Sequence, residues 1–147
     1  MKNYKNRFEL FLKNNSFLPF ENWDFFDLEH GDKTIFKNNS EKIRKEVDKK
    51  SGIYVYKKER DVLYVGKAAS LFVRLKSHNR ESFEPVPGDT KHKTWHKFFS
   101  RNKGKLLVYW KEVTLENDRV VIEKMLEYIL EPKFEFFKKK FEGRINE

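Results

Sequence analysis

The sequence predicts an α+β fold in which a small three-stranded antiparallel sheet is flanked by helices. Two observations lead to this prediction. Short runs rich in β-branched and aromatic residues occur at 52–57, 62–66 and 105–113, and a polar turn joins the first two. Stretches with the apolar spacing of helices precede, separate and follow these runs. At 147 residues the chain has room for one domain with a single core.

Residues 1–50 are expected to form an extension packed on this core. Residues 2–14 have helical spacing, with Phe8, Leu12 and Phe11 on one side. Residues 15–39 mix turn residues with many aromatics, which indicates an irregular but packed segment. Ser40 is a suitable N-cap for a short helix to Lys49, because an acid follows in the first turn.

Residues 51–147 are expected to form the main domain, which begins with a hairpin whose turn is 58–61. Ser70 has the side chain of an N-cap for a helix that runs to about His78. The following stretch, 79–90, contains two prolines and a glycine, and it therefore reads as a loop.

The second half of this domain is expected to contain two helices around the third strand. A short helix covers 95–102 and ends before Gly104. After the strand, Asn117 or Asp118 caps a helix that continues to Leu130, because Pro132 disfavours further helix. The tail alternates phenylalanine with charge and then carries three lysines in a row.

Composition excludes several classes of protein and of site. The chain has no cysteine, so disulfides, thiolate zinc sites and a cysteine nucleophile are absent, and a metal would need oxygen or imidazole ligands. No apolar run approaches the roughly 18 residues of a membrane span, and the N-terminus lacks the apolar stretch of a signal peptide. We expect an intracellular, cytoplasmic protein of a bacterial or phage-encoded type.

The net charge of +9 is concentrated in the second part of the chain, because the first 40 residues hold as many acids as bases. Between Asp89 and Glu112 there is no acid, and this interval is the expected binding surface for a polyanion. A solvated basic face is the alternative. The predicted nucleic-acid-binding residues are Lys91, Lys93, Lys97, Arg101, Lys103 and Lys105.

The hairpin carries two tyrosines and a glycine beside a lysine. Tyr54 and Tyr64 could be ordinary strand aromatics. Gly66 permits close approach of the backbone at the strand end, and Lys67 follows it just before a helix start, where free N–H groups favour a phosphate. Each signal is weak alone, but together they indicate a site.

Two charged stripes border the predicted core. Arg74 and His78 are four residues apart on one helix, at the edge of its apolar arc. Glu123 lies at the margin of the buried face of the last core helix, whereas Lys124 and Glu127 are expected to point to solvent. A partly buried carboxylate requires a cation, a metal or a proton, and a structural ion pair of Glu123 with Arg74 or Lys67 is the alternative.

These residues together resemble the GIY-YIG nuclease superfamily. The resemblance rests on Gly52-Ile53-Tyr54, nine further residues, then Tyr64-Val65-Gly66, followed by the lysine, the helix arginine and the later glutamate. It covers about residues 51–135, and the stretch YVGKAASLFVRL is most similar to the nuclease domain of the excision-repair incision enzyme. Compact restriction and phage endonucleases of the superfamily are similarly short.

The resemblance implies a metal-dependent endonuclease and assigns its residues. Glu123 would hold the one divalent ion per active site, Mg²⁺ or Mn²⁺, and Arg74 would brace the phosphate. Tyr54 and Tyr64 are the motif tyrosines, and Lys67 and His78 match groups found in many members. Tyr54 or His78 would be the general base, a choice that the sequence leaves open.

The sequence departs from the superfamily at one position, which bears on how the metal site is supported and on which metal it prefers. Many members carry an asparagine shortly after the metal-binding helix, in the setting Pro-x-x-Asn. Here that position, three residues after Pro132, is Glu135.

We expect double-stranded DNA as the substrate, in restriction, phage or mobile-element biology, with RNA also open. A homodimer would explain how one site per chain cuts two strands, and no membrane association is expected. One alternative is a structure-selective repair nuclease. Another is a catalytically silent nucleic-acid-binding module.

Overall fold

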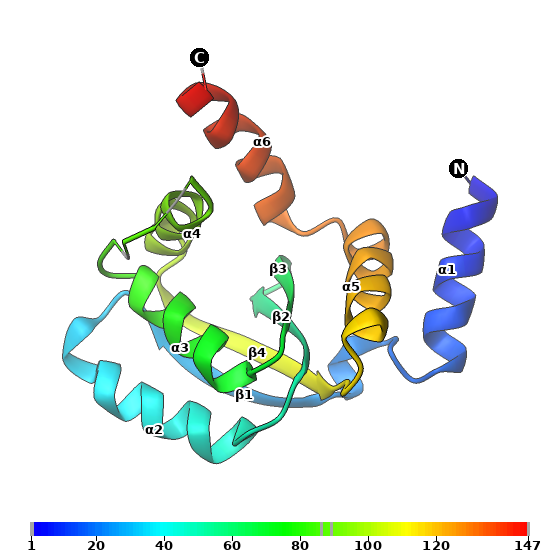
Figure 1. Ribbon diagram of the computed structural model, residues 1–147, viewed down its shortest axis with the longest axis horizontal. Helices are drawn as coiled ribbons and strands as arrows, with labels where there is room; N and C mark the ends of the chain where they lie inside the picture. Colours follow the sequence, from blue (N-terminus) through cyan, green and yellow to red (C-terminus); the bar gives the residue numbers. More distant parts are fainter. Residues whose placement is uncertain (1, 86, 89, 147) are drawn as a thin grey trace.

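The computed structural model describes residues 2–85, 87–88 and 90–146 of the chain. It is an α+β fold in which helices cover both faces of one antiparallel sheet (Figure 1). The elements are, in order, α1 (Lys2–Asn14), η1 (Phe20–Asn22), β1 (Asp24–His30), η2 (Lys33–Ile35), α2 (Phe36–Val47), β2 (Gly52–Lys58), β3 (Asp61–Ala68), α3 (Leu71–Glu81), α4 (Thr90–Arg101), β4 (Gly104–Glu112), α5 (Glu116–Leu130) and α6 (Lys133–Asn146).

The sheet has four strands in the order β1-β4-β2-β3, so the prediction of three strands is wrong. The additional strand, β1, lies within the stretch 15–39 that was expected to be irregular. It pairs antiparallel with β4 over its whole length, from Asp24 opposite Trp110 to His30 opposite Gly104. The N-terminal 50 residues therefore supply an edge strand to the sheet, and β3 is the other edge.

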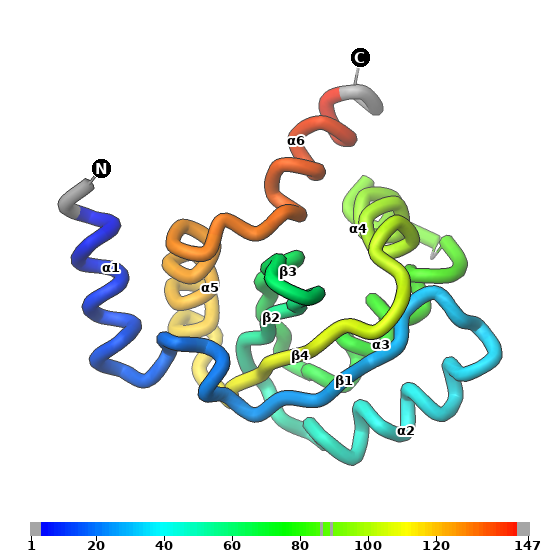
Figure 2. Tube along the Cα trace, turned by 180° about the vertical axis from the view of Figure 1, so that it is seen from behind, coloured from blue at the N-terminus to red at the C-terminus, as the bar shows by residue number. Residues whose placement is uncertain are grey.

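One face of the sheet packs against α5, and α1 runs beside α5 at the same end of the molecule (Figures 1 and 2). Ile53, Val55 and Val65 project from the strands to this face, as the two-residue period of a strand requires. Ile122 and Leu126 of α5 meet them. The predicted helical spacing of 2–14 is confirmed by α1, which packs Leu12 into the same core.

The opposite face carries a core rich in aromatic side chains. Tyr54, Tyr56 and Tyr64 point to this face and pack against α2, α3, α4 and the start of α6. Phe99 of α4 is fully buried among them. Many rings in T-shaped or tilted contact fill this core, which explains how a chain with 37% charged residues forms a packed interior.

The helix predictions succeed where the caps are local and fail where tertiary contacts decide. Ser70 accepts a hydrogen bond from the backbone N–H of Val73 and caps α3, which continues to Glu81. Ser40 is not an N-cap, because α2 begins earlier and the Ser40 hydroxyl donates to the carbonyl of Phe36. The last core helix ends at Leu130 as predicted, although Leu115 takes the N-cap position.

Two other regions contain more helix than expected. The predicted loop 79–90 is shorter, because α3 extends into it from one side and α4 starts at Thr90 instead of Trp95. The tail forms α6, although its phenylalanines alternate with charged residues. No helix in the described part of the chain is long and apolar enough to cross a membrane.

Candidate active site

A cleft of about 540 Å³ opens along the edge strand β3. Its walls come from α3 and α4 on the aromatic side of the sheet, α5 on the other side, and α6. The edge of the sheet is suited to such a site, because side chains from both faces of an edge strand can reach the same cleft. The cleft thus brings together residues that are far apart in the sequence.

Four of the six predicted catalytic residues line this cleft: Tyr64 and Lys67 from β3, Arg74 from α3 and Glu123 from α5. Tyr64 projects toward the aromatic core and Lys67, three residues later, toward the opposite face. Arg74 lies one turn into α3, where its guanidinium is 5.3 Å from the centroid of the Trp95 ring. The alternative of an ion pair that neutralises Glu123 is not found among the described residues, since no salt bridge joins Glu123 to Arg74 or Lys67.

Glu123 has the properties of a ligand for a hard cation. The residue is only 9% exposed, and no group in the described ranges donates a hydrogen bond to its carboxylate. Burial raises its pKa, and the positive charge of Lys67 opposes that shift. A divalent cation with oxygen ligands fits such a carboxylate. Within the described chain no group of three or more acidic or histidine side chains is arranged as a complete metal site, so water and phosphate oxygens would complete the coordination.

Two further carboxylates lie in the same cleft. Glu127 was expected to point to solvent, but it is half-buried and lines the cleft, where its carboxylate is 3.4 Å from the ammonium of Lys124. Burial raises its pKa to about 7, and the negative charges of Glu123 and Glu135 act in the same direction. Glu135, at the position where the resemblance leads one to expect an asparagine, also lines the cleft and is ion-paired with Lys138 at 3.0 Å.

Tyr54 and His78 do not line the cleft. Both are fully buried behind Tyr64, whose ring stacks 5.8 Å from that of Tyr54 and lies 5.2 Å from that of His78. The Tyr54 hydroxyl is 2.7 Å from Nε2 of His78. Burial raises the pKa of Tyr54 well above its ordinary value and lowers the pKa of His78 well below its own. The two candidates for the general base therefore form one hydrogen-bonded unit.

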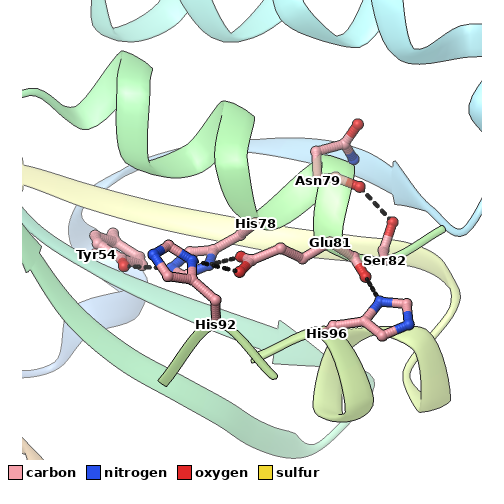
Figure 3. A network of polar contacts seen from close by, with 7 residues as sticks. All are labelled: Tyr54, His78, Asn79, Glu81, Ser82, His92 and His96. Atoms are coloured by element: carbon pink, nitrogen blue, oxygen red, sulfur yellow. Dashed lines mark hydrogen bonds and ion pairs between the residues drawn. The ribbon is translucent and has the colours of Figure 1, made fainter. Parts of the chain in front are cut away.

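The polar network continues beyond this pair to residues that the sequence analysis did not select. Nδ1 of His78 is 3.0 Å from Oε1 of Glu81, which is also fully buried. The second oxygen of Glu81 is 3.4 Å from Nδ1 of His92, and the Glu81 carbonyl accepts a hydrogen bond from His96 (Figure 3). The available signal was an acid three residues after a histidine on one helix, which places both on one face.

The two motif glycines are explained by close approaches of other groups. A Cβ on Gly52 would overlap the carbonyl of Lys111 in the neighbouring strand β4. A Cβ on Gly66 would overlap the ring and hydroxyl of Tyr54, its partner across the β2–β3 pair. The spacing of the two motifs therefore places Gly66 opposite Tyr54, where the glycine leaves room for the tyrosine ring.

The predicted nucleic-acid-binding residues are all exposed, but they do not form one surface at the cleft. Lys91 lines the cleft, and Lys93, Lys97 and Arg101 follow it along α4. The last two of the set, Lys103 and Lys105, lie at the start of β4, beside β1. Lys103 packs its side chain on Gly31, and Lys105 is ion-paired with Asp27 at 3.4 Å.

The chain is similar to solved structures of the GIY-YIG N-terminal endonuclease domain of UvrC from Thermotoga maritima. A Tyr-to-Phe point mutant of that domain, bound to its catalytic divalent cation, matches with 23% identity and a TM-score of 0.45, covering 64% of this chain and 96% of that one. A second Tyr-to-Phe mutant and an Asn-to-Ala mutant, also bound to the cation, each match with 25% identity over 64% of this chain and 94% of theirs, with TM-scores of 0.42 and 0.43.

No family model matches the chain, and no curated protein sequence matches it either.

Proposed function

We propose that the chain is a metal-dependent endonuclease that hydrolyses phosphodiester bonds in DNA. The observation that carries this proposal is the convergence of Tyr64, Lys67, Arg74 and Glu123 on one cleft. These residues come from three different elements and match the motif positions of a nuclease superfamily. Among the described residues, the buried carboxylate of Glu123 has no hydrogen-bond or ion-pair partner, and Lys67 and Arg74 line the same cleft, which suits a site that gains its missing charge from a ligand.

Hydrolysis of a phosphodiester requires stabilisation of charge on the phosphate, activation of a water and help for the leaving 3′-oxygen. Arg74 can donate forked hydrogen bonds to the non-bridging oxygens, and Lys67 adds a second positive charge. When bound at Glu123, Mg²⁺ or Mn²⁺ would supply a Lewis acid for the phosphate and the leaving oxygen. The products would carry 5′-phosphate and 3′-hydroxyl ends.

Tyr54 and His78 would provide the proton acceptor. The Tyr54 hydroxyl packs against Gly66 of β3. The two chain neighbours of this glycine, Val65 and Lys67, line the cleft. As the tyrosine oxygen takes a proton from water, its own proton would pass to Nε2 of His78. This use of both groups explains why a tyrosine whose pKa is raised by burial can still act as a base.

Duplex DNA is the proposed substrate because basic side chains continue from the cleft along α4. Lys91 lies in the cleft itself, and Lys93, Lys97 and Arg101 are exposed on the same helix. Contacts of these residues with phosphates would hold the duplex without reading its sequence. Two copies of the chain would be needed to cut both strands in one encounter.

The test is incubation of the purified chain with supercoiled plasmid, long linear duplex and branched DNA, with Mg²⁺, Mn²⁺ or chelator. Metal-dependent cutting of plain duplex into discrete fragments would support an enzyme of restriction, phage or mobile-element type. Preference for branched or flapped DNA would support a repair nuclease. Salt-sensitive binding without cutting of any substrate would contradict the proposal and favour a binding module.

A further inference from the structure

A continuous line of polar contacts runs from the Tyr54 hydroxyl to the protein surface. It passes through Nε2 and Nδ1 of His78, at 2.7 and 3.0 Å, to the carboxylate of Glu81. The other oxygen of Glu81 meets His92, whose side chain is 34% exposed. Figure 3 shows these side chains in sequence, from β2 across α3 to α4.

The ring of His78 is held in one orientation by its neighbours. Trp95 packs edge-on at 4.8 Å between centroids, and Phe99 lies on another side at 4.7 Å. Each ring nitrogen of His78 has one polar partner: Nε2 faces the Tyr54 hydroxyl, and Nδ1 faces the carboxylate of Glu81. The protonation state of those partners therefore decides which nitrogen carries the proton.

A neutral imidazole has one N–H and one acceptor nitrogen. For Tyr54 to donate its proton, Nε2 must be the acceptor and Nδ1 must carry the hydrogen. A carboxylate on Nδ1 enforces that tautomer, because it can only accept a hydrogen bond. Glu81 occupies this position, and its side chain is fully buried beside the ring of His78.

We propose that Glu81 is a positioning residue that fixes the tautomer of His78 and receives its Nδ1 proton when Tyr54 activates water. This inference rests on the proposed function and extends it by assigning a role to Glu81 that neither the motifs nor the resemblance gives. It turns Tyr54, His78 and Glu81 into a triad, with His92 at the solvent end.

The protons balance along this triad. Water gives one proton to the Tyr54 oxygen, the Tyr54 hydroxyl gives its proton to Nε2 of His78, and Nδ1 gives its proton to Oε1 of Glu81. The hydroxide formed attacks the phosphorus, the P–O bond to the 3′-oxygen breaks, and the 3′-oxygen takes a proton from solvent. Glu81 ends as a neutral acid. Before the next turnover it returns the proton to Nδ1 of His78, Nε2 returns its proton to the Tyr54 oxygen, and the Tyr54 hydroxyl releases its own to solvent, which restores the starting tautomer.

The electrostatic surroundings of Glu81 agree with a proton acceptor. Burial raises its pKa to about 8, against the opposing charge of Arg74. An acceptor with a pKa near the working pH can both take and release a proton. The titratable and charged groups facing this network are Arg74 and His78 on α3, Lys91, His92 and His96 on α4, His30 on β1, and Tyr54, Tyr56 and Tyr64 on the sheet.

The first arm of the test measures kcat and KM for cleavage of a duplex at saturating metal from pH 6 to pH 10. Glu81→Gln keeps the size of the side chain but cannot take the proton, and we expect a loss in kcat of about 100-fold with KM changed less than about threefold. The rise of kcat through about pH 8 should disappear in this variant, because the group that ionises there is gone. Glu81→Asp, which keeps the carboxylate, should have a kcat about tenfold higher than that of Glu81→Gln.

The matched control is Glu84→Gln, which removes the same charge three residues later. Glu84 is ion-paired with Arg80 and Lys33 outside the network, so kcat and its pH profile should stay parental. If Glu81→Gln keeps the parental kcat and pH profile, or if Glu84→Gln loses as much activity, the proposal is overturned.

The second arm needs no DNA and separates a failure of this inference from a failure of the proposed function. ¹⁵N spectra of the histidine rings at pH 9 should show His78 as the neutral Nδ1–H tautomer in the parent, and a changed tautomer in Glu81→Gln. An Nε2–H tautomer in the parent would overturn the triad even in an active nuclease. A parent with the expected tautomer that cuts no DNA would overturn the proposed function, and with it any catalytic role of Glu81.

Discussion

Gly66 lies directly across the β2–β3 pair from Tyr54, and any side chain at Gly66 would occupy the space of the tyrosine ring and hydroxyl. The two halves of the motif, which are separated along the chain, thus meet at one point. Gly66 also stands between Val65 and Lys67, two residues of the cleft wall, so the Tyr54 hydroxyl lies against the backbone of the strand that forms this wall.

Replacement of this glycine should be costly. We expect Gly66→Ala to lower the free energy of unfolding by about 1–3 kcal/mol, because the added methyl group overpacks the Tyr54 ring. Urea denaturation measures this change. Gly143→Ala is the control, since a Cβ at that helical position meets nothing within 4 Å and alanine favours a helix. Equal stability of Gly66→Ala and the parent would contradict the packing described for Tyr54.

Glu123 should be a residue that the fold does not need. Its pKa is raised by burial, so the folded state holds the proton more tightly than the unfolded chain, and stability falls as the pH rises above the ordinary glutamate value. Without divalent metal, Glu123→Gln should therefore have a melting temperature at pH 8 no lower than that of the parent. Thermal unfolding followed by circular dichroism measures it.

The same variant should lose its response to metal. Mn²⁺ is expected to raise the melting temperature of the parent but not that of Glu123→Gln, because a ligand stabilises only the state that binds it. Glu116→Gln, which removes an exposed acid from the first turn of the same helix, should respond like the parent. A parental metal response in Glu123→Gln would remove Glu123 from the metal site.

His30 should make the fold sensitive to acid. It is buried against Tyr56 and Phe99, neither of its ring nitrogens has a hydrogen-bond partner in the described structure, and burial lowers its pKa to about 3. Its neutral form is favoured in the folded state, so stability is present above the ordinary histidine pKa and is lost as the pH falls toward 3. The size is about 1.4 kcal/mol per pH unit for a fully buried group.

Urea denaturation of His30→Leu at pH 5 and pH 7 tests this expectation. The variant should lose less stability than the parent between the two pH values, and at pH 7 it should be at least as stable, because leucine leaves no buried polar atom unpaired. An equal loss in parent and variant would show that His30 does not contribute to the acid sensitivity.

The basic residues should divide into two groups. Lys93→Ala combined with Lys97→Ala should weaken duplex binding and reduce the slope of log K against log salt by about 1.8, if each lysine contacts one phosphate. Fluorescence anisotropy in the presence of chelator measures the slope. Lys105→Ala should leave it unchanged, because Lys105 is ion-paired with Asp27 on the other side of the sheet. An effect of Lys105 equal to that of the α4 lysines would place the DNA elsewhere.

Local sequence signals predicted the hairpin, α1 and the cap of α3, because each depends on neighbours in the chain. Strand β1 was missed because its pairing partner, β4, lies about 80 residues later, and turn residues surround it. The helix α6 was missed because phenylalanines spaced two apart resemble a strand, while in the structure Phe134 and Phe137 pack on the aromatic core formed by other elements.

The site shows the same division. Motif spacing indicated Tyr64, Lys67, Arg74 and Glu123, which the cleft brings together. It could not indicate that Tyr54 and His78 lie behind the cleft wall, because that depends on how α3 packs on the sheet. The contact of His78 with Glu81 lies within α3, and the three-residue spacing was its only signal. Glu127 was placed in solvent because the helix α6, whose Glu135 and Lys138 line the cleft with it, was not predicted.

The central claim is that Arg74 and Glu123 serve one hydrolytic site for DNA. The most direct measurement is cleavage of plasmid and linear duplex by the parent, Arg74→Ala and Glu123→Ala, with Mg²⁺, with Mn²⁺ and with chelator. We predict cutting by the parent only with metal, and loss of cutting in both variants while both remain folded. Cutting that persists in chelator, or in either folded variant at the parental rate, would contradict the account.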